Sequence, residues 1–119
     1  NPPQFYDQRT QVIDKRHTEA MSDFLRGVVT QGTAIRLNAL CQKHNIQLCA
    51  KTGTTNDCKD AWIVGYTKNW GTQNVVIGIF IGYPQPESMG KMATGSKIAL
   101  PFLADLLEQM ATLRGQFHW

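Results

Sequence analysis

Residues 46–66 read I-Q-L-C-A-K-T-G-T-T-N-D-C-K-D-A-W-I-V-G-Y, two strand-like runs on either side of a polar turn. The first run, Ile46–Thr52, begins with apolar residues, and the second, Ala61–Tyr66, is rich in the Trp, Ile, Val and Tyr residues that favour strands. Asn56 and Asp57 lie between the runs and are typical turn residues. This stretch therefore predicts two consecutive strands joined by a short turn.

A third apolar run, Val75–Ile81, follows the turn residues Lys68, Asn69 and Gly71. It is interrupted only by Gly78 and shows no alternation of polar and apolar residues. A strand without alternation is typically buried on both sides, so we expect both faces of this strand to be covered.

Helical patterns flank the three strands. Asp14 can cap a helix that ends near Thr30, and Thr33 can cap a shorter helix that ends near Gln42. Apolar residues at helical spacing predict the core-facing side of the first helix: Met21, Phe24, Leu25, Val28 and Val29. The last helix begins near Gly95 and has a similar side, formed by Ile98, Phe102, Leu103, Leu106, Leu107 and Met110. This order predicts an α+β fold, a three-stranded antiparallel sheet flanked by helices.

At 119 residues, the chain is long enough for one domain with a buried core, and a second domain is not expected. The net charge of +3 is spread along the sequence, with no basic run longer than Lys15-Arg16, so we expect no nucleic-acid partner. No stretch approaches the roughly 20 apolar residues that span a bilayer. Any membrane anchor is therefore expected outside residues 1–119.

The cysteines and histidines give no metal-binding signature. Cys41, Cys49 and Cys58 lack zinc-finger spacing, and we interpret them as small, half-buried thiols. A disulfide between Cys41 and Cys49 stays open as an alternative in an oxidising compartment. We expect all three histidines on the solvated surface: His17, His44 and His118. No metal or cofactor is predicted.

Residues 50–57 concentrate hydrogen-bond donors. The ammonium of Lys51, the hydroxyls of Thr52 and Thr54 and the backbone N–H groups beside Gly53 are the donors that a carboxylate or phosphate needs. The alternative is a polar turn at the end of a strand. These eight residues by themselves leave both interpretations open.

The neighbouring motifs extend the pattern over most of the chain. They are V-I-D at 12–14, G-V-V-T-Q-G-T-A at 27–34, A-K-T-G-T-T-N-D-C-K-D-A-W-I-V-G-Y-T at 50–67, G-I-F-I-G-Y at 78–83, M-G at 89–90 and A-T-G at 93–95. K-T-G is itself a motif of penicillin-interacting serine enzymes. In this order and spacing, from about residue 9 to residue 111, the chain resembles the C-terminal part of the transpeptidase domain of class A, bifunctional penicillin-binding proteins.

The resemblance implies roles for the K-T-G-T segment, which would lie on an edge strand of a β-lactamase/transpeptidase-like fold. Lys51 would supply positive charge to the active-site cleft. Thr52 and Thr54 would donate hydroxyl hydrogen bonds to the carboxylate of a peptidoglycan stem peptide or a β-lactam. Gly53 would let the substrate backbone approach closely, and the backbone N–H of Thr54 would be one of two oxyanion-hole donors.

The family's nucleophile is expected to lie outside this chain. The family uses a serine with a lysine one helical turn later, S-x-x-K, and a further S-x-N segment. Only Ser88-Met89-Gly90-Lys91 spells S-x-x-K here, and nothing spells S-x-N. This match follows K-T-G instead of preceding it, and its glycine and the prolines before it predict a loop. We therefore expect Ser88 not to be catalytic and the chain to be inactive alone.

Two functions of different classes follow. The first is a part of a serine D,D-transpeptidase that cross-links peptidoglycan, is acylated by β-lactams and works on the periplasmic or extracytoplasmic side of the inner membrane. The second is a stand-alone, non-catalytic module that binds cell-wall peptide or a protein partner. A fragment of a serine β-lactamase is a weaker third interpretation. The resemblance also implies that the strand at 75–81 pairs with an earlier strand that this chain lacks. We therefore expect its free edge to pair with the N-terminal segment or with the same strand in a homodimer.

Overall fold

The computed structural model describes residues 9–72 and 74–117. Nine helical and strand elements follow one another along these residues: α1 (Lys15–Thr30), a 3₁₀ turn η1 (Ile35–Leu37), α2 (Asn38–Lys43), β1 (Gln47–Thr54), a 3₁₀ turn η2 (Asn56–Cys58), β2 (Asp60–Lys68), β3 (Val76–Gly82), a π-helical turn η3 (Gly95–Ala99) and α3 (Leu100–Phe117).

The three strands form one antiparallel sheet in the order β1-β2-β3. The register places Lys51 of β1 opposite Val64 of β2, and Ile63 of β2 opposite Ile79 of β3. Within the described residues, β1 and β3 are therefore the two edges of the sheet. The predicted α+β class and the antiparallel pairing are confirmed.

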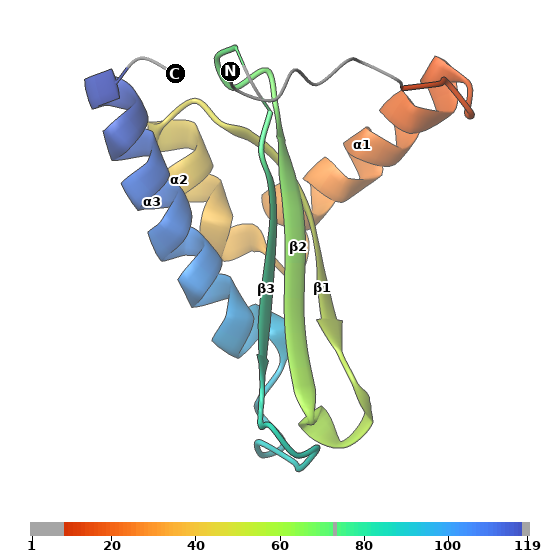
Figure 1. The fold of residues 1–119 in the computed structure, drawn as a ribbon, viewed down its shortest axis with the longest axis vertical. Helices are drawn as coiled ribbons and strands as arrows, with labels where there is room; N and C mark the ends of the chain where they lie inside the picture. The colour runs from red at the N-terminus through yellow and green to blue at the C-terminus, as the bar shows by residue number, and fades with distance from the viewer. Residues whose placement is uncertain (1–8, 73, 118–119) are drawn as a thin grey trace, which may run out of the picture.

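The main core lies between the sheet and the layer of α2 and α3, which cover the same face of the sheet (Figure 1). Side chains alternate along a strand, so this face receives every second residue of each strand. Leu48, Ile63 and Ile77 of the sheet share a buried cluster with Leu103 and Leu107 of α3. The core-facing side of α3 is narrower than predicted, because Phe102 and Leu106 are exposed.

The helix α1 lies on the opposite side of the sheet from α3 (Figure 1). Asp14 caps it as predicted, accepting a hydrogen bond from the Arg16 N–H at 2.8 Å. The predicted core stripe of this helix is partly wrong, since Val29 is buried while Met21 and Phe24 are 57% and 76% exposed. The helix packs instead through Ser22, which is buried and follows Met21 in the sequence. Met21 and Phe24 therefore lie on sides of α1 that point away from the sheet.

The prediction that both faces of the third strand are covered is wrong. Ile77 of β3 is buried, but Val76 and Phe80 are 76% and 50% exposed. These exposed residues lie on the α1 side of the sheet, where α1 packs against β1 and leaves β3 uncovered. An apolar strand sequence does not report which of its faces has a neighbour.

Smaller expectations also need correction. Thr33 caps no helix, because η1 begins after Ala34 and has no side-chain cap. His44 is not solvated, since its side chain is 20% exposed and its Nε2 lies 2.9 Å from a carboxylate oxygen of Glu108. His17 is exposed as expected, and His118 lies outside the described residues. All three cysteines are free thiols, so the alternative of a Cys41–Cys49 disulfide is not adopted in this structure.

Candidate active-site edge

The K-T-G-T segment forms the second half of β1, the edge strand where the resemblance places it. The N–H of Thr55, just beyond β1, donates to the carbonyl of Asp60 across the sheet at 3.1 Å. In an antiparallel pair, successive residues bond alternately towards the partner and away from it. Lys51 and Gly53 thus direct their backbone groups to β2, and Thr52 and Thr54 direct theirs away from the sheet.

Lys51 reaches the same free edge by its side chain. Its Nζ donates to the carbonyl oxygen of the adjacent residue, Thr52, at 2.7 Å. The side chain is exposed, and among the described residues no carboxylate lies within 4.0 Å of its ammonium group. The charge of Lys51 is therefore available to an anion that approaches the outer side of β1.

The hydroxyls of Thr52 and Thr54 lie on the opposite face of β1 from the Lys51 side chain, because side chains alternate along the strand. Three donors can therefore meet at one ligand only at the strand edge, where the lysine bends over the Thr52 carbonyl. The hydroxyl oxygen of Thr52 lies 3.0 Å from that of Thr33, in the segment that follows α1.

Thr54 is held from another part of the chain. Its Oγ1 accepts a hydrogen bond from the backbone N–H of Gly95, at the start of η3, at 3.0 Å. A side chain at Gly95 would overlap the Trp62 carbonyl oxygen and would lie 2.7 Å from the Gly53 carbonyl oxygen. Glycine therefore permits η3 to rest directly on β1 beneath the motif.

Sequence reasoning missed both of these partners. Thr33 and Gly95 lie 19 and 41 residues from the threonines that they contact. The only signals were their places in the G-T-A and A-T-G motifs, which we interpreted as a helix cap and a helix start. Their contacts depend on how α1 and η3 pack on β1, which no local pattern states.

The S-x-x-K match at Ser88 lies in a loop, as predicted. Residues 83–94 form no helix. The Ser88 hydroxyl accepts a hydrogen bond from the Gly90 N–H at 3.2 Å. The N–H of Met89 bonds to the Cys58 carbonyl at 3.0 Å, which ties this loop to the turn after β1. Lys91 is not positioned by helical spacing to act on Ser88.

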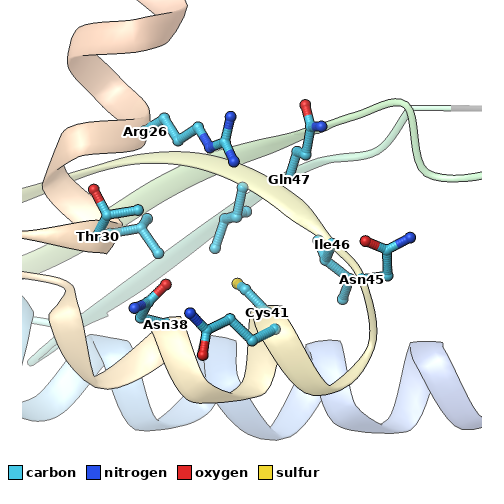
Figure 2. Close-up of a pocket in the computed structure, with 10 residues that line it drawn as sticks. Arg26, Thr30, Asn38, Cys41, Asn45, Ile46 and Gln47 are labelled. Carbon is cyan, nitrogen blue, oxygen red and sulfur yellow. The ribbon is translucent and has the colours of Figure 1, made fainter.

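A separate cavity of about 340 Å³ lies at the beginning of β1, between the end of α1 and α2 (Figure 2). Amide side chains such as Asn38, Asn45 and Gln47 line it together with Arg26 and the thiol of Cys41. Burial raises the pKa of the Cys41 thiol to about 11, so this thiol is neutral at ordinary pH. The lining of this cavity contains no carboxylate and none of the K-T-G-T residues.

The family is decided by a model of the penicillin-binding protein transpeptidase domain, which matches residues 2–108. The chain belongs to this family. The resemblance seen in the motifs is confirmed, and the edge of β1 is part of a penicillin-binding transpeptidase domain.

Curated relatives of this transpeptidase domain are penicillin-binding proteins 1A. The protein from Aquifex aeolicus is 38% identical over 98 residues, which cover 82% of this chain and 12% of the relative. Those from Neisseria lactamica and Rickettsia prowazekii are 39% and 34% identical, over 82% and 81% of this chain and 11% of each relative. The chain thus spans about one ninth of the length of the relatives that it matches. None of the helices in the described residues has the length and apolar content needed to cross a membrane.

Proposed function

We propose that this chain forms the carboxylate-binding and oxyanion wall of a serine D,D-transpeptidase that cross-links peptidoglycan. The observation that carries the proposal is the placement of the Lys51 ammonium 2.7 Å from the Thr52 carbonyl, on the free edge of β1. The terminal carboxylate of a D-alanyl-D-alanine stem peptide, or the carboxylate of a β-lactam, would bind there. Lys51 supplies the charge, and Thr52 and Thr54 donate hydroxyl hydrogen bonds.

The backbone of the same edge suits an extended peptide. Thr52 and Thr54 turn their N–H and C=O groups outward, so a substrate strand can add to β1 by main-chain hydrogen bonds. Gly53 lies between them, and a Cβ there would meet only the Trp62 Cβ, at 3.5 Å. The outward N–H of Thr54 is the proposed oxyanion donor, and losing such a donor typically slows acyl transfer by about 10²- to 10³-fold.

The proposed reaction uses a serine outside this chain. That serine attacks the penultimate D-alanine carbonyl and expels the terminal D-alanine, which leaves an acyl-enzyme. An amine of a neighbouring stem peptide then attacks the acyl-enzyme, so that a new amide bond forms and the serine is released. The parent enzyme would work on the periplasmic or extracytoplasmic face of the inner membrane and be anchored by a segment outside these residues.

Titration of the isolated chain with N-acetyl-D-alanyl-D-alanine and with its C-terminal amide tests the carboxylate site. The two ligands differ only at the terminus, where the amide carries no charge and has an NH2 donor in place of one carboxylate oxygen. We expect amide-resolved NMR to show a preference for the carboxylate, with shifts at residues 51–54. Thr52→Val and Lys51→Met should each remove that preference. Equal affinity of the wild-type chain for the two ligands would refute the proposal.

Labelling with a fluorescent penicillin tests whether this chain is a complete enzyme or only a part of one. We expect no covalent label on the chain alone, because we assign the nucleophile to another part of the parent protein. Label on Ser88 would show that this assignment is wrong. Sub-millimolar peptide affinity without any acylation of a parent protein would favour the stand-alone binding module instead.

We also propose that β3 pairs with β3 of a second copy. The Thr67 N–H donates to the Val75 carbonyl at 2.9 Å, so by alternation the backbone groups of Val76, Gly78, Phe80 and Gly82 point away from β2. When two copies of β3 pair antiparallel about a two-fold axis at Ile79, these outward groups form hydrogen bonds with one another.

Side chains in this register are complementary. Gly78 lies opposite Phe80 of the partner subunit, and Val76 lies opposite Gly82 of the partner subunit. A Cβ at Gly78 would meet no atom within 4 Å, which leaves open surface for the partner's Phe80. No charged residue occurs between 75 and 82, so the pairing brings no like charges together.

A further inference from the structure

Thr33 lies beside the proposed carboxylate site without belonging to its motif. Its Oγ1 and the Oγ1 of Thr52 are 3.0 Å apart, a hydrogen bond in which either hydroxyl can donate. We propose that Thr33 is a positioning residue that directs the Thr52 hydroxyl towards the carboxylate of the ligand. This inference rests on the function proposed above.

The backbone around Thr33 is fixed closely. The N–H groups of Gly32 and Ala34 both donate to the carbonyl of Val28, each at 3.1 Å. Ala34 is fully buried, and a Cβ at Gly32 would lie 2.9 Å from the Val28 Cα. The turn after α1 therefore holds Thr33 from both sides and leaves its side chain to point at β1.

The hydrogens of the two hydroxyls can be counted. Each threonine hydroxyl has one hydrogen to donate and two lone pairs to accept with. The Thr33–Thr52 hydrogen bond uses one of the two hydrogens. When a carboxylate, which only accepts, binds at Thr52, the Thr52 hydrogen goes to the ligand and Thr33 donates to Thr52. Thr33 thereby restrains the Thr52 rotamer. Its hydroxyl hydrogen keeps the Thr33–Thr52 hydrogen bond in place while the Thr52 hydrogen is donated to the ligand.

The hydroxyl of Thr54 also has a hydrogen-bond partner outside β1. Its Oγ1 already accepts the Gly95 N–H at 3.0 Å, so the Thr54 hydrogen is not needed for that contact. When Thr33 donates to Thr52, both hydroxyls of the motif accept from donors outside β1. Each of them keeps a hydrogen for an anion at the strand edge.

Thr33 is exposed and Thr52 is half-buried, and their hydrogen bond is open to solvent, so deleting one hydroxyl leaves no buried polar group without a partner. Thr33→Val removes the hydroxyl and keeps the branched shape, while Thr33→Ser keeps the hydroxyl. Thr112→Val is a matched control, because among the described residues the Thr112 hydroxyl bonds within its own helix, to the Glu108 carbonyl 3.0 Å away. The same two ligands, N-acetyl-D-alanyl-D-alanine and its amide, are titrated into each variant.

We expect Thr33→Val to weaken binding of the carboxylate ligand roughly threefold to tenfold, the range of one ordinary hydrogen bond, and to leave the amide ligand unchanged. Thr33→Ser should restore the affinity, and Thr112→Val should have none of these effects. The double variant Thr33→Val, Thr52→Val should bind no more weakly than Thr52→Val alone.

Three results would overturn the inference. If Thr33→Val keeps the wild-type preference while Thr52→Val loses it, the carboxylate site stands and Thr33 has no part in it. If Thr33→Val weakens both ligands equally, its role is structural. If the wild-type chain itself does not prefer the carboxylate, the proposed function fails and the role of Thr33 fails with it.

Discussion

Gly95 donates its backbone N–H to the Thr54 hydroxyl oxygen at 3.0 Å, across 41 residues of sequence. This contact joins the start of the last helical segment to the end of the K-T-G-T strand. It is close because Gly95 has no side chain, and a Cβ there would lie 2.7 Å from the Gly53 carbonyl oxygen. The geometry of the proposed site therefore depends on a glycine outside its motif.

Gly95→Ala should destabilise the chain by about 1–3 kcal/mol, because the added methyl group must push η3 away from β1. Urea denaturation measures the change. Gly27→Ala is the matched control, since a Cβ at Gly27 would meet no atom within 4 Å. That variant lies inside α1 and should gain about 0.5–1 kcal/mol. Equal stability of the two variants would contradict the close approach at Gly95.

Glu108 should make stability depend on acid pH. Its carboxylate accepts hydrogen bonds from Lys43 Nζ and from His44 Nε2, each at 2.9 Å. The hydrogen bond from Lys43, and then that from His44, holds the pKa of Glu108 below its ordinary value of 4.5. A lowered folded-state pKa stabilises the fold above the unfolded pKa, and that stabilisation is lost as the pH falls through the folded value.

We therefore expect the wild-type chain to lose stability relative to Glu108→Gln below about pH 4.5. Denaturation at a series of pH values below pH 5 measures the stability of both proteins. Parallel pH profiles throughout this range would mean that the pair of contacts does not couple Glu108 to folding.

Val76→Pro should abolish self-association through β3. The backbone N–H of Val76 points away from β2, and proline is tolerated at such edge positions while it removes the donor that a partner strand needs. Val76→Thr is the control, because it keeps the N–H and the β-branched shape. Sedimentation velocity should show a dimer for wild type and Val76→Thr and a monomer for Val76→Pro. A monomeric wild-type chain would refute the proposed pairing.

A cysteine on the proposed axis tests the register of this dimer. Ile79 would lie opposite Ile79 of the partner subunit at a non-hydrogen-bonded position, where Cα atoms are about 4.5 Å apart and a disulfide can form. In a Cys58→Ser background, Ile79→Cys should cross-link on mild oxidation. Val76→Cys should not, because it would lie opposite Gly82 of the partner subunit. The reverse result would place the axis elsewhere.

Cys41 should resist thiol reagents in the folded chain. Burial keeps its thiol out of solvent and raises its pKa to about 11, and the thiolate is the reactive form. At pH 8 we expect Cys58, which is half-buried near the surface, to react first, and Cys41 to react only on unfolding. Mass spectrometry after timed labelling measures the order. Equal rates would show that α2 opens readily over the cavity in Figure 2.

Much of the fold follows from local patterns in the sequence. The apolar start of the first run and the β-branched and aromatic second run, on either side of Asn56 and Asp57, predict β1 and β2. In the structure β1 begins one residue later and ends two residues later than predicted, and β2 is longer by one residue at its start and two at its end. Asp14 predicts the start of α1 because an N-cap needs only its own next few residues. Family motifs, which depend on order along the chain, also indicated the transpeptidase domain before any geometry was known.

Faces and distant contacts could not be read in this way. Phe24 and Val76 belong to apolar patterns that predict burial, yet both are largely exposed, because α1 covers β1 and does not extend over β3. His44 looked like a surface residue until α3 brought Glu108 within 2.9 Å of it. Hydrophobic periodicity reports which residues share a face, while burial depends on which element lies opposite.

By itself, the sequence determined the succession of three strands and the family, and it led us to propose a site at Lys51–Thr54, because these depend on short-range propensity and on motif order. The tertiary structure alone decided how their donors are arranged. It brought Thr33 and Gly95 to the hydroxyls of Thr52 and Thr54 at 3.0 Å, and among the described residues it placed no strand on the outer edge of β1, where we propose that a ligand strand binds. The physical reason is that a hydroxyl can donate or accept, and only its neighbours in space fix which of the two it does.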